Sequence, residues 1–436
     1  MEVFSTTLSV VWTIIKTWWW ILLPFVLWKH FAFMWREWRK DEYAKGVNNQ
    51  FYELKMPREV ERPFKAMEQV LAGWWMFYDP NDWWETWWEG KYQVKISVEV
   101  MSDGGEIHFY LRFPKALRNL IESSIYAQYP EAELVEAEDY TARVPQDIPN
   151  EKWDLWGTDY ELMKPDIYPL KTYKRFFEET TVSKEYQRVD PMAALLEALA
   201  KAKPGEQIWV QFIISPVTTS EDDYIQRAKD EVAKLAYRGD SKSRIKDKPM
   251  IQKMVEVVVT GKPPGEMIVE ESESILPPEM KLTPGEREIV SQVELKVSKM
   301  MYNTVIRFIV LGERDKWNKA NLKTVLGYFN NFNTENTNRM KPWNPSTTRI
   351  SKNKAFFLNV FLHQRKLYML KRKLFRQYRA RMNFHFPRNS DMSYILNIEE
   401  LASMFHIVGR TAIPAPNVQR IESKKAEPPA DLPWNE

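Results

Sequence analysis

The fold is decided by residues 92–137, which read YQVKISVEVMSDGGEIHFYLRFPKALRNLIESSIYAQYPEAELVEA. Polar and apolar residues alternate from Tyr92 to Met101, as they do in a half-buried strand. Ser102-Asp103-Gly104-Gly105 has the composition of a tight hairpin turn, and 107–113 reads as the returning strand. Pro114 then opens a helix over 115–128, and a short strand follows over 132–137. The stretch therefore predicts a β-β-α-β unit.

A related pattern follows toward the C-terminus. Residues 168–177 are predicted as a strand, Asp190 and Pro191 begin a helix over 192–202, and 207–214 is an apolar strand. We therefore expect an α+β fold in which an N-terminal transmembrane helix precedes ferredoxin-like β-α-β units in mixed or antiparallel sheets. A second α/β unit is expected further along, with a strand over 302–311 and a short helix over 397–404.

Shifts in composition divide the chain into six predicted parts. These are a membrane anchor (1–45), a Trp-rich membrane-proximal segment (46–90), a first α+β domain (91–219), a charged helical and Pro-rich insertion (220–290), a second α+β domain with a basic helix (291–405) and a Pro-rich C-terminal tail (406–436). The length of 436 residues leaves room for two or three domains, each with its own core.

The anchor is predicted from residues 8–28, LSVVWTIIKTWWWILLPFVLW. This run is close to the ~20 residues that cross a bilayer, although Lys16 and Pro24 weaken it. An interfacial helix and a buried core helix are the alternatives. No Lys or Arg precedes the run, and several follow it: Lys29, Arg36, Arg39 and Lys40. The positive-inside rule then predicts a single pass through the cell inner membrane of a bacterium, with the body in the cytoplasm.

Tryptophan is unusually frequent, with 19 in the chain. Its ring is apolar and its N–H is polar, so it favours the headgroup region of a membrane. The predicted membrane-contacting residues are Trp12, Trp18, Trp19, Trp20, Trp28, Trp83, Trp84, Trp87 and Trp88. The region from Trp74 and Trp75 to Trp88 reads as a second membrane-surface contact or as a docking helix for a partner, and an aromatic core is an equally open reading.

Basic residues gather in one helix. Between residues 336 and 390 there are fourteen Lys or Arg and no Asp or Glu, in a chain of net charge +3. The predicted helix over 361–382 has an apolar stripe flanked by these cations: Arg365, Lys366, Lys371, Arg372, Lys373, Arg376, Arg379 and Arg381. Such a helix is suited to contact nucleic acid or anionic lipid, or it pairs with acidic segments of the chain or a protein partner.

The sequence offers no catalytic constellation. There is no cysteine, the five histidines form no metal-ligand pair, and Ser215 lacks a nucleophile-elbow motif. Glu399 and Glu400 are expected to cap or solvate the helix over 397–404. We therefore predict no enzyme, no catalytic or cofactor-binding residues, no metal site and no cofactor.

Several segments resemble one protein family. The run from Glu106 to Tyr140, QFIISP at 211–216, ILNIEELASMFHIVGR at 395–410 and IESKKAEPPADLP at 421–433 are similar to the membrane-anchored N-terminal region of conjugative, type IV secretion-class ATPases. The resemblance implies a non-catalytic scaffold, or the N-terminal half of a translocation machine, that docks an ATPase at the inner membrane. It also implies a ring-forming partner, and it leaves DNA as cargo and a homo-oligomer open.

The ATPase domain of that family is absent from this sequence. The only Gly-Lys pairs, Gly90-Lys91 and Gly261-Lys262, lack the earlier glycine and the following Ser or Thr of a phosphate-binding loop. The motor is therefore expected to be encoded separately or to continue beyond Glu436. The alternative function is a nucleic-acid-binding or anionic-lipid-binding module that uses the helix over 361–382.

Overall fold

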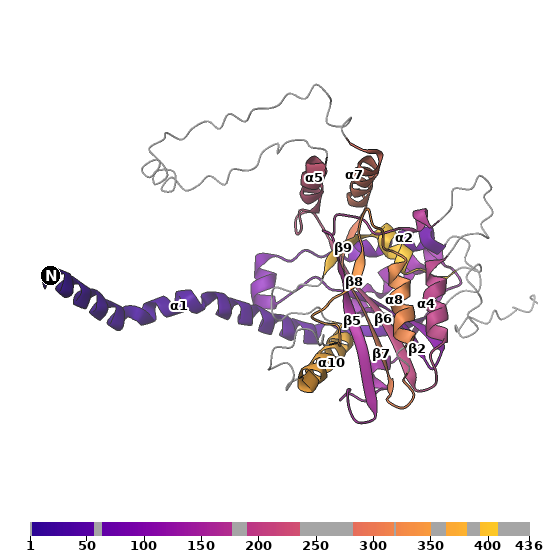
Figure 1. Ribbon diagram of the computed structural model, residues 1–436, viewed down its shortest axis with the longest axis horizontal. Coiled ribbons are helices and arrows are strands. Elements are labelled where there is room, and N and C mark those ends of the chain that lie inside the picture. Colours follow the sequence, from indigo (N-terminus) through magenta and orange to yellow (C-terminus); the bar gives the residue numbers. More distant parts are fainter. Residues whose placement is uncertain are drawn as a thin grey trace, which may run out of the picture.

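The computed structural model describes residues 2–55, 63–176, 190–235, 282–317, 320–349, 363–381 and 393–408. Within the first 26 residues it describes side chains only at Trp12, Thr13, Lys16 and Thr17. The described part is an α+β body built on one antiparallel sheet, from which a single long helix projects (Figure 1).

The projecting helix is α1, Glu2–Gly46, with 45 residues. At 1.5 Å per residue it is about 68 Å long, and its N-terminal end lies far from the body (Figure 1). Among the residues that the structure describes, no helix is long and apolar enough to cross a membrane. Most side chains of the predicted span over 8–28 lie outside the described part.

The first half of the sheet has the element order β-α-β-β-α-β, the order of a split βαβ unit. Its elements are β1 (Asn49–Lys55), α2 (Pro63–Trp74), β2 (Ile96–Asp103), β3 (Glu106–Pro114), α3 (Arg118–Gln128) and β4 (Glu133–Glu136). The strands lie side by side in the order β4-β1-β3-β2, and all their pairings are antiparallel. Gly104 and Gly105 have φ angles of 58° and 101°, which a tight hairpin turn requires, so the predicted hairpin is confirmed.

The second half repeats this order of elements. It consists of β5 (Trp153–Leu162), α4 (Pro191–Ala200), β6 (Glu206–Val217), β7 (Met301–Glu313), α8 (Ala320–Asn330) and β8 (Met340–Pro342). Its strands lie in the order β8-β5-β7-β6, so each half places its four strands in the same relative order. The halves meet where β2 pairs antiparallel with β6, from Ile96 opposite Ile214 to Asp103 opposite Gln207.

The predicted division into two α+β domains therefore does not divide the sheet, because one sheet contains strands of both. Strand β6 of the segment 91–219 pairs along its whole length with β7 of the segment 291–405. The strand predicted over 168–177 is wrong, because its described residues, 168–176, are irregular apart from the short 3-10 helix η5 (Tyr173–Arg175). Pro169 supplies no N–H for a strand ladder, and the corresponding place in the sheet belongs to β5.

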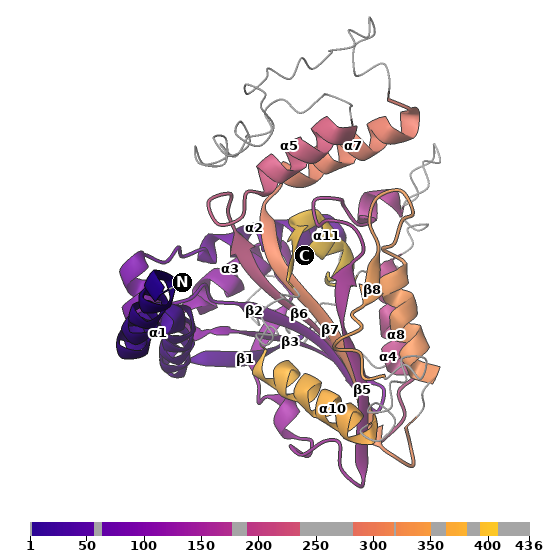
Figure 2. The ribbon, with the colours of Figure 1, turned by 60° about the vertical axis from the view of Figure 1, so that its left-hand side comes forward.

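Two layers of helix cover the sheet. On one face, apolar side chains of α2, α3, α4, α8 and α11 (Ile398–Met404) form the main core with the strands. The other face is covered by α10 (His363–Ala380) and by η4 (Tyr140–Ala142), which pack on a second core (Figure 2). Apolar residues alternate between the two cores along each central strand, as expected for a sheet that is buried on both faces.

The remaining elements are additions to this scheme. Between β6 and β7, α5 (Tyr224–Leu235) packs against α7 (Pro284–Val297) to form a small core of its own at one end of the body (Figures 1 and 2). Strand β9 (Tyr394–Asn397) pairs with the start of β7. A capping box between Asn397 and Glu400 begins α11, which confirms the predicted capping role of Glu400. The other short helices are η1 (Trp75–Phe77), η2 (Glu85–Glu89) and η3 (Lys115–Leu117).

Candidate functional site

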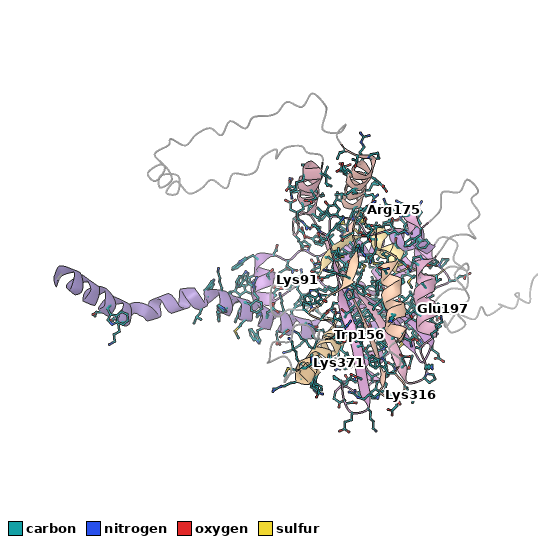
Figure 3. The ribbon with its side chains drawn as sticks, in the orientation of Figure 1. Lys91, Trp156, Arg175, Glu197, Lys316 and Lys371 are labelled. Atoms are coloured by element: carbon teal, nitrogen blue, oxygen red, sulfur yellow. The ribbon has the colours of Figure 1, made fainter. Side chains whose placement is uncertain are left out.

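Helix α10 has a buried face and an exposed face. Its buried face consists of Lys371, Leu374, Phe375 and Tyr378, which recur at the three-to-four-residue spacing of one helix side. Lys371 Nζ lies 2.6 Å from Asp154 Oδ1 on β5 (Figure 3). The apolar side chains of this face pack into the second core. The side of α10 that faces the sheet is thus occupied by structural contacts.

Arg381 directly follows α10 and is buried as well. Its backbone has a φ of 51°, in the left-handed region that few residues other than glycine adopt. This conformation directs the guanidinium back toward the sheet, where Nε lies 2.9 Å from Glu99 Oε1. The same guanidinium also pairs with Asp139, with Nη2 2.9 Å from Oδ1. Lys371 and Arg381 were predicted as surface contacts, and this is wrong because both charges are neutralised inside the fold.

The exposed face of α10 carries the rest of the predicted basic residues. Arg379 is partly buried and Lys373 is exposed. Arg372 is exposed and donates to the Tyr368 hydroxyl at 2.7 Å. Within the described part of the chain, the exposed side chains Arg365, Lys366 and Arg376 form no ion pair. This face therefore presents positive charge to solvent, as predicted, but with fewer residues than the sequence suggests.

A row of polar side chains crosses the sheet beneath α10. Neighbouring strands place the following residues opposite one another in register: Tyr110, Glu99, Gln211, Arg307 and Asp159. Gln211 Nε2 donates to Glu99 Oε1 at 2.9 Å, and the Tyr140 hydroxyl donates to Glu99 Oε2 at 2.7 Å. At the other end of the row, Arg307 Nε lies 3.0 Å from Asp159 Oδ1. The row ties α10 to both halves of the sheet.

Glu99 is the centre of this network. Burial alone would raise the pKa of its carboxyl group, but the charge of Arg381 and hydrogen bonds from Arg381, Ser97 and Tyr140 outweigh burial and hold the pKa below its ordinary value. Burial, with the nearby charge of Glu99 adding to it, also raises the pKa of Tyr140 well above its ordinary value, so this hydroxyl keeps its proton and remains a donor. The charges of the network are paired with one another, since Arg381 lies against Glu99 and Asp139, and Arg307 lies against Asp159. We assign it a structural role.

A cavity of about 400 Å³ opens beside the end of this network. It lies between the C-terminal end of α1, the segment before β2, the ends of β6 and β7, and the end of α10. Its lining includes Tyr92, Arg112, Ser215 and Asn303. Tyr92, Arg112 and Asn303 were not selected from the sequence. The available signal was a charged residue between two apolar ones, since Arg112 lies between Leu111 and Phe113 in β3.

An aromatic surface is the most exposed apolar feature of the described residues. We call it the aromatic collar; it consists of Leu27, Trp28, Phe31, Met34 and Trp38 of α1 and of Trp83, Trp84 and Trp88 at η2. Each of these side chains is at least 46% exposed. Apolar patches of this kind mark sites of interaction with proteins or membranes.

Specific contacts hold η2 against α1. Trp35 Nε1 donates to the Trp87 carbonyl oxygen at 2.7 Å, and the rings of Trp35 and Trp88 meet edge to face at 5.8 Å. Gly90 ends η2 with a φ of 74°, and a Cβ atom there would lie 2.2 Å from the Arg39 carbonyl group. Only glycine fits this approach. The collar is therefore held in place by specific contacts, and its residues of α1 lie in the C-terminal half of that helix, the half that reaches the body (Figure 1).

The predicted membrane tryptophans fall into three groups. Trp12, Trp28, Trp83, Trp84 and Trp88 are exposed, and Trp87 is partly buried under Arg36. The side chains of Trp18, Trp19 and Trp20 lie outside the described residues. Trp74 is instead a core residue, only 1% exposed, and Trp75 donates to the Met301 carbonyl oxygen at 3.1 Å. Of the readings left open for these two residues, the aromatic core is therefore confirmed.

Metal ligands do not converge in the described residues, where no group of three or more His, Asp or Glu could hold an ion. His406 is buried and its Nε2 lies 3.0 Å from Asp190 Oδ1, the carboxylate that caps α4. His108 Nδ1 lies 2.6 Å from Glu53 Oε1 across β3 and β1. Both pairs link elements of the fold.

No curated protein matches the chain. A family model described as "Domain of unknown function (DUF8128)" matches residues 89–407, from the end of η2 to the end of the second half of the sheet and its additions. The matched range includes the cavity residues of the segment before β2 and of β3, β6 and β7, together with α10, and it leaves out α1, β1 and α2. The match covers well over half of the sequence, so the chain belongs to the DUF8128 family.

Proposed function

We propose that this protein is a non-catalytic scaffold attached to the bacterial inner membrane by α1, with its α+β body in the cytoplasm. The aromatic collar is the observation that carries the proposal. Trp28, Trp38 and Trp84 expose more than half of their side-chain surface at the point where α1 leaves the body. Exposed tryptophan is costly in water and favoured at the boundary between headgroups and acyl chains.

The charges around the collar agree with this placement. Arg36 stacks over Trp87 at 5.3 Å, and Arg39 stacks over Trp38 at 5.5 Å. Cations beside interfacial aromatic rings are suited to lipid phosphates, at about 1 kcal/mol for each basic residue near an anionic surface. The N-terminal side of α1 has no Lys or Arg before Lys16, so the positive-inside rule supports a cytoplasmic body.

Attachment can be tested because the chain has no cysteine. A single Trp84→Cys substitution labelled with an environment-sensitive fluorophore should shift to shorter wavelength when the full chain is reconstituted into vesicles. Lys316→Cys is the matched control, because Lys316 is exposed on the body away from α1 (Figure 3). Equal spectra at both positions in vesicles and in detergent would contradict the proposal.

The resemblance to type IV secretion-class ATPases extends the proposal to a partner. In this reading, the body holds a separately encoded or C-terminally continued ATPase at the membrane. Supporting features are the repeated α+β scheme and the helix pair α5 and α7, which projects from it. Crosslinking at a benzoylphenylalanine placed at Leu295, 62% exposed on α7, should capture an ATPase in the native host. Crosslinks to every abundant protein alike would contradict this.

A second candidate function is binding of nucleic acid or anionic lipid by the exposed face of α10. The observation in its favour is that Arg365, Lys366 and Arg376 are exposed and form no ion pair within the described residues. Binding of a DNA duplex should weaken steeply with salt, and the slope should fall in an Arg365→Gln, Lys366→Gln, Arg376→Gln variant. Binding that is unchanged in this variant would exclude the candidate.

A further inference from the structure

The cavity beside Arg112 contains an unusual set of hydrogen-bonding groups. Four of them make no hydrogen bond within the described residues: the Arg112 guanidinium, the Tyr92 and Ser215 hydroxyls and the Asn303 side-chain amide. They come from β3, the segment before β2, β6 and β7, so the fold brings them together from distant parts of the sequence. Polar groups that are partly withdrawn from water and have no partner are costly unless something binds them.

The cation at the centre of this set is poorly compensated. Burial, and then the nearby guanidinium of Arg381, lower the pKa of Arg112. Glu99 and Asp139 are the acids whose negative charge acts most on Arg112. Both are already paired with Arg381. An anion bound in the cavity would give Arg112 an ion-pair partner, which the described residues do not provide.

We propose that this cavity binds a small phosphate-bearing molecule through Arg112. A guanidinium donates two parallel N–H groups to a phosphate. Two hydroxyls and an amide add further hydrogen-bond donors. A planar carboxylate has only two oxygens to accept from these donors, whereas a tetrahedral phosphate has three terminal oxygens that point in different directions. The volume of about 400 Å³ is within the range of small-molecule sites.

The walls of the cavity indicate what else the ligand carries. The charged groups that line it are Lys40, Lys95, Arg112 and Arg381 on the positive side and Glu37, Asp41 and Glu221 on the negative side. Glu37 is paired with Lys40 at 3.0 Å, which leaves Asp41 and Glu221 facing the cavity. These carboxylates favour a ligand whose phosphate is accompanied by an ammonium or hydroxyl group. A phosphoethanolamine-like molecule has this chemistry, either free in solution or as a lipid headgroup.

The test uses the full chain in detergent with two probes at 10 mM, O-phosphoethanolamine and inorganic phosphate. Sodium chloride, added to the same ionic strength, is the control. O-phosphoethanolamine should raise the midpoint of thermal unfolding by about 2–4 °C relative to the chloride control. Inorganic phosphate should raise it less, because it offers nothing to Asp41 and Glu221. Calorimetric titration then gives the affinities.

Arg112→Gln should lower the affinity for O-phosphoethanolamine at least tenfold. Arg287→Gln removes the same charge from an exposed position on α7, away from the cavity, and should leave the affinity unchanged. If Arg112→Gln fails to fold, Tyr92→Phe and Asn303→Ala each remove one donor and should weaken binding several-fold. No response to either phosphate probe in the folded wild-type chain, or an Arg112→Gln variant that binds like the wild type, would overturn the proposal.

The source of the phosphate is decided by competition. Vesicles that contain phosphatidylethanolamine should displace O-phosphoethanolamine if the ligand is a lipid headgroup, whereas vesicles of phosphatidylcholine alone should not. Displacement by neither vesicle, with Arg112-dependent binding intact, assigns the site to a soluble phosphate compound. The proposal does not depend on membrane attachment, since the soluble probes test it in detergent.

Discussion

The two cores of the sheet and the aromatic collar place tryptophan in opposite environments. Trp74 and Trp209 are at most 1% exposed and lie in the two cores of the sheet. Trp83 and Trp84 are at least 59% exposed and lie on the collar, next to α1. The difference teaches that the tryptophans of this chain serve two ends: some pack the cores of the body, and others form an exposed aromatic surface.

The largest effect on stability is expected from the core. Trp209→Ala should lower the free energy of unfolding by about 3–5 kcal/mol, because it removes a ring that packs against Tyr140, Phe375 and Tyr378. Denaturant titration of the full chain in detergent measures this loss. A change below 1 kcal/mol would show that α10 does not pack on the sheet as described.

Glu99→Gln should cost about 3 kcal/mol, because it leaves the buried Arg381 with one carboxylate partner in place of two. Circular dichroism against denaturant provides the measurement. Ser97→Ala is the matched control, because it removes only a hydrogen bond that a neutral hydroxyl donates at 2.6 Å to the same carboxylate, and it should cost about 1.5 kcal/mol. An equal loss of unfolding free energy in both variants would contradict the importance of the ion pair between Glu99 and Arg381.

The same carboxylate predicts a pH dependence. The pKa of Glu99 is lower in the folded chain than its ordinary value of 4.5. Its contribution is therefore complete above about pH 4.5 and is lost as the pH falls through the folded pKa. The unfolding free energy of the wild type should decrease over this acidic window more steeply than that of Glu99→Gln, which cannot titrate there. Parallel pH profiles would be inconsistent with the network.

Helix α10 gives a smaller contrast between a buried and an exposed cation. Lys371→Gln removes a largely buried pair with Asp154 and should cost about 1.5–3 kcal/mol. Lys366→Gln on the exposed face should change stability by less than about 0.5 kcal/mol. Thermal unfolding of the two variants side by side measures the difference. If Lys366→Gln proves the more costly, the orientation of α10 is wrong.

The smallest effect on stability is expected at the collar. Replacing Trp83, Trp84 and Trp88 together with Ala should change the unfolding free energy in detergent by no more than about 1 kcal/mol, since their rings are largely exposed. The same variant should bind vesicles less tightly than the wild type. A loss of stability as large as that of Trp209→Ala would mean that these rings belong to the core.

The sequence predicted some of these features well. The hairpin at Ser102-Asp103-Gly104-Gly105, strands β2, β3, β6 and β7, and the start of α11 were all found, because their apolar periodicity and turn residues are local signals. Strand β5 was missed, since Asp154, Thr158 and Asp159 interrupt its apolar pattern. These residues are buried by partners far along the chain: Lys371, Thr347 and Arg307.

The same limit applies to the site. The basic residues at α10 were selected for their charge. Charge does not show which of them are buried, as Lys371 and Arg381 are. Arg112, Tyr92 and Asn303 were missed because only the antiparallel pairing of β3, β2, β6 and β7 brings them to one cavity. Periodicity describes one element at a time, whereas a site assembled from several strands depends on their order in the sheet.

The most direct test of membrane attachment is the topology of single-cysteine variants in bacterial cells. The natural chain has no cysteine, so each variant reports one position. Ser5→Cys, near the far end of α1, should react with a membrane-impermeant maleimide added to intact cells whose outer membrane has been opened. Glu197→Cys, on α4 away from α1 (Figure 3), should react only after the inner membrane is disrupted. Labelling of both positions, or of neither, before disruption would contradict a single pass with a cytoplasmic body.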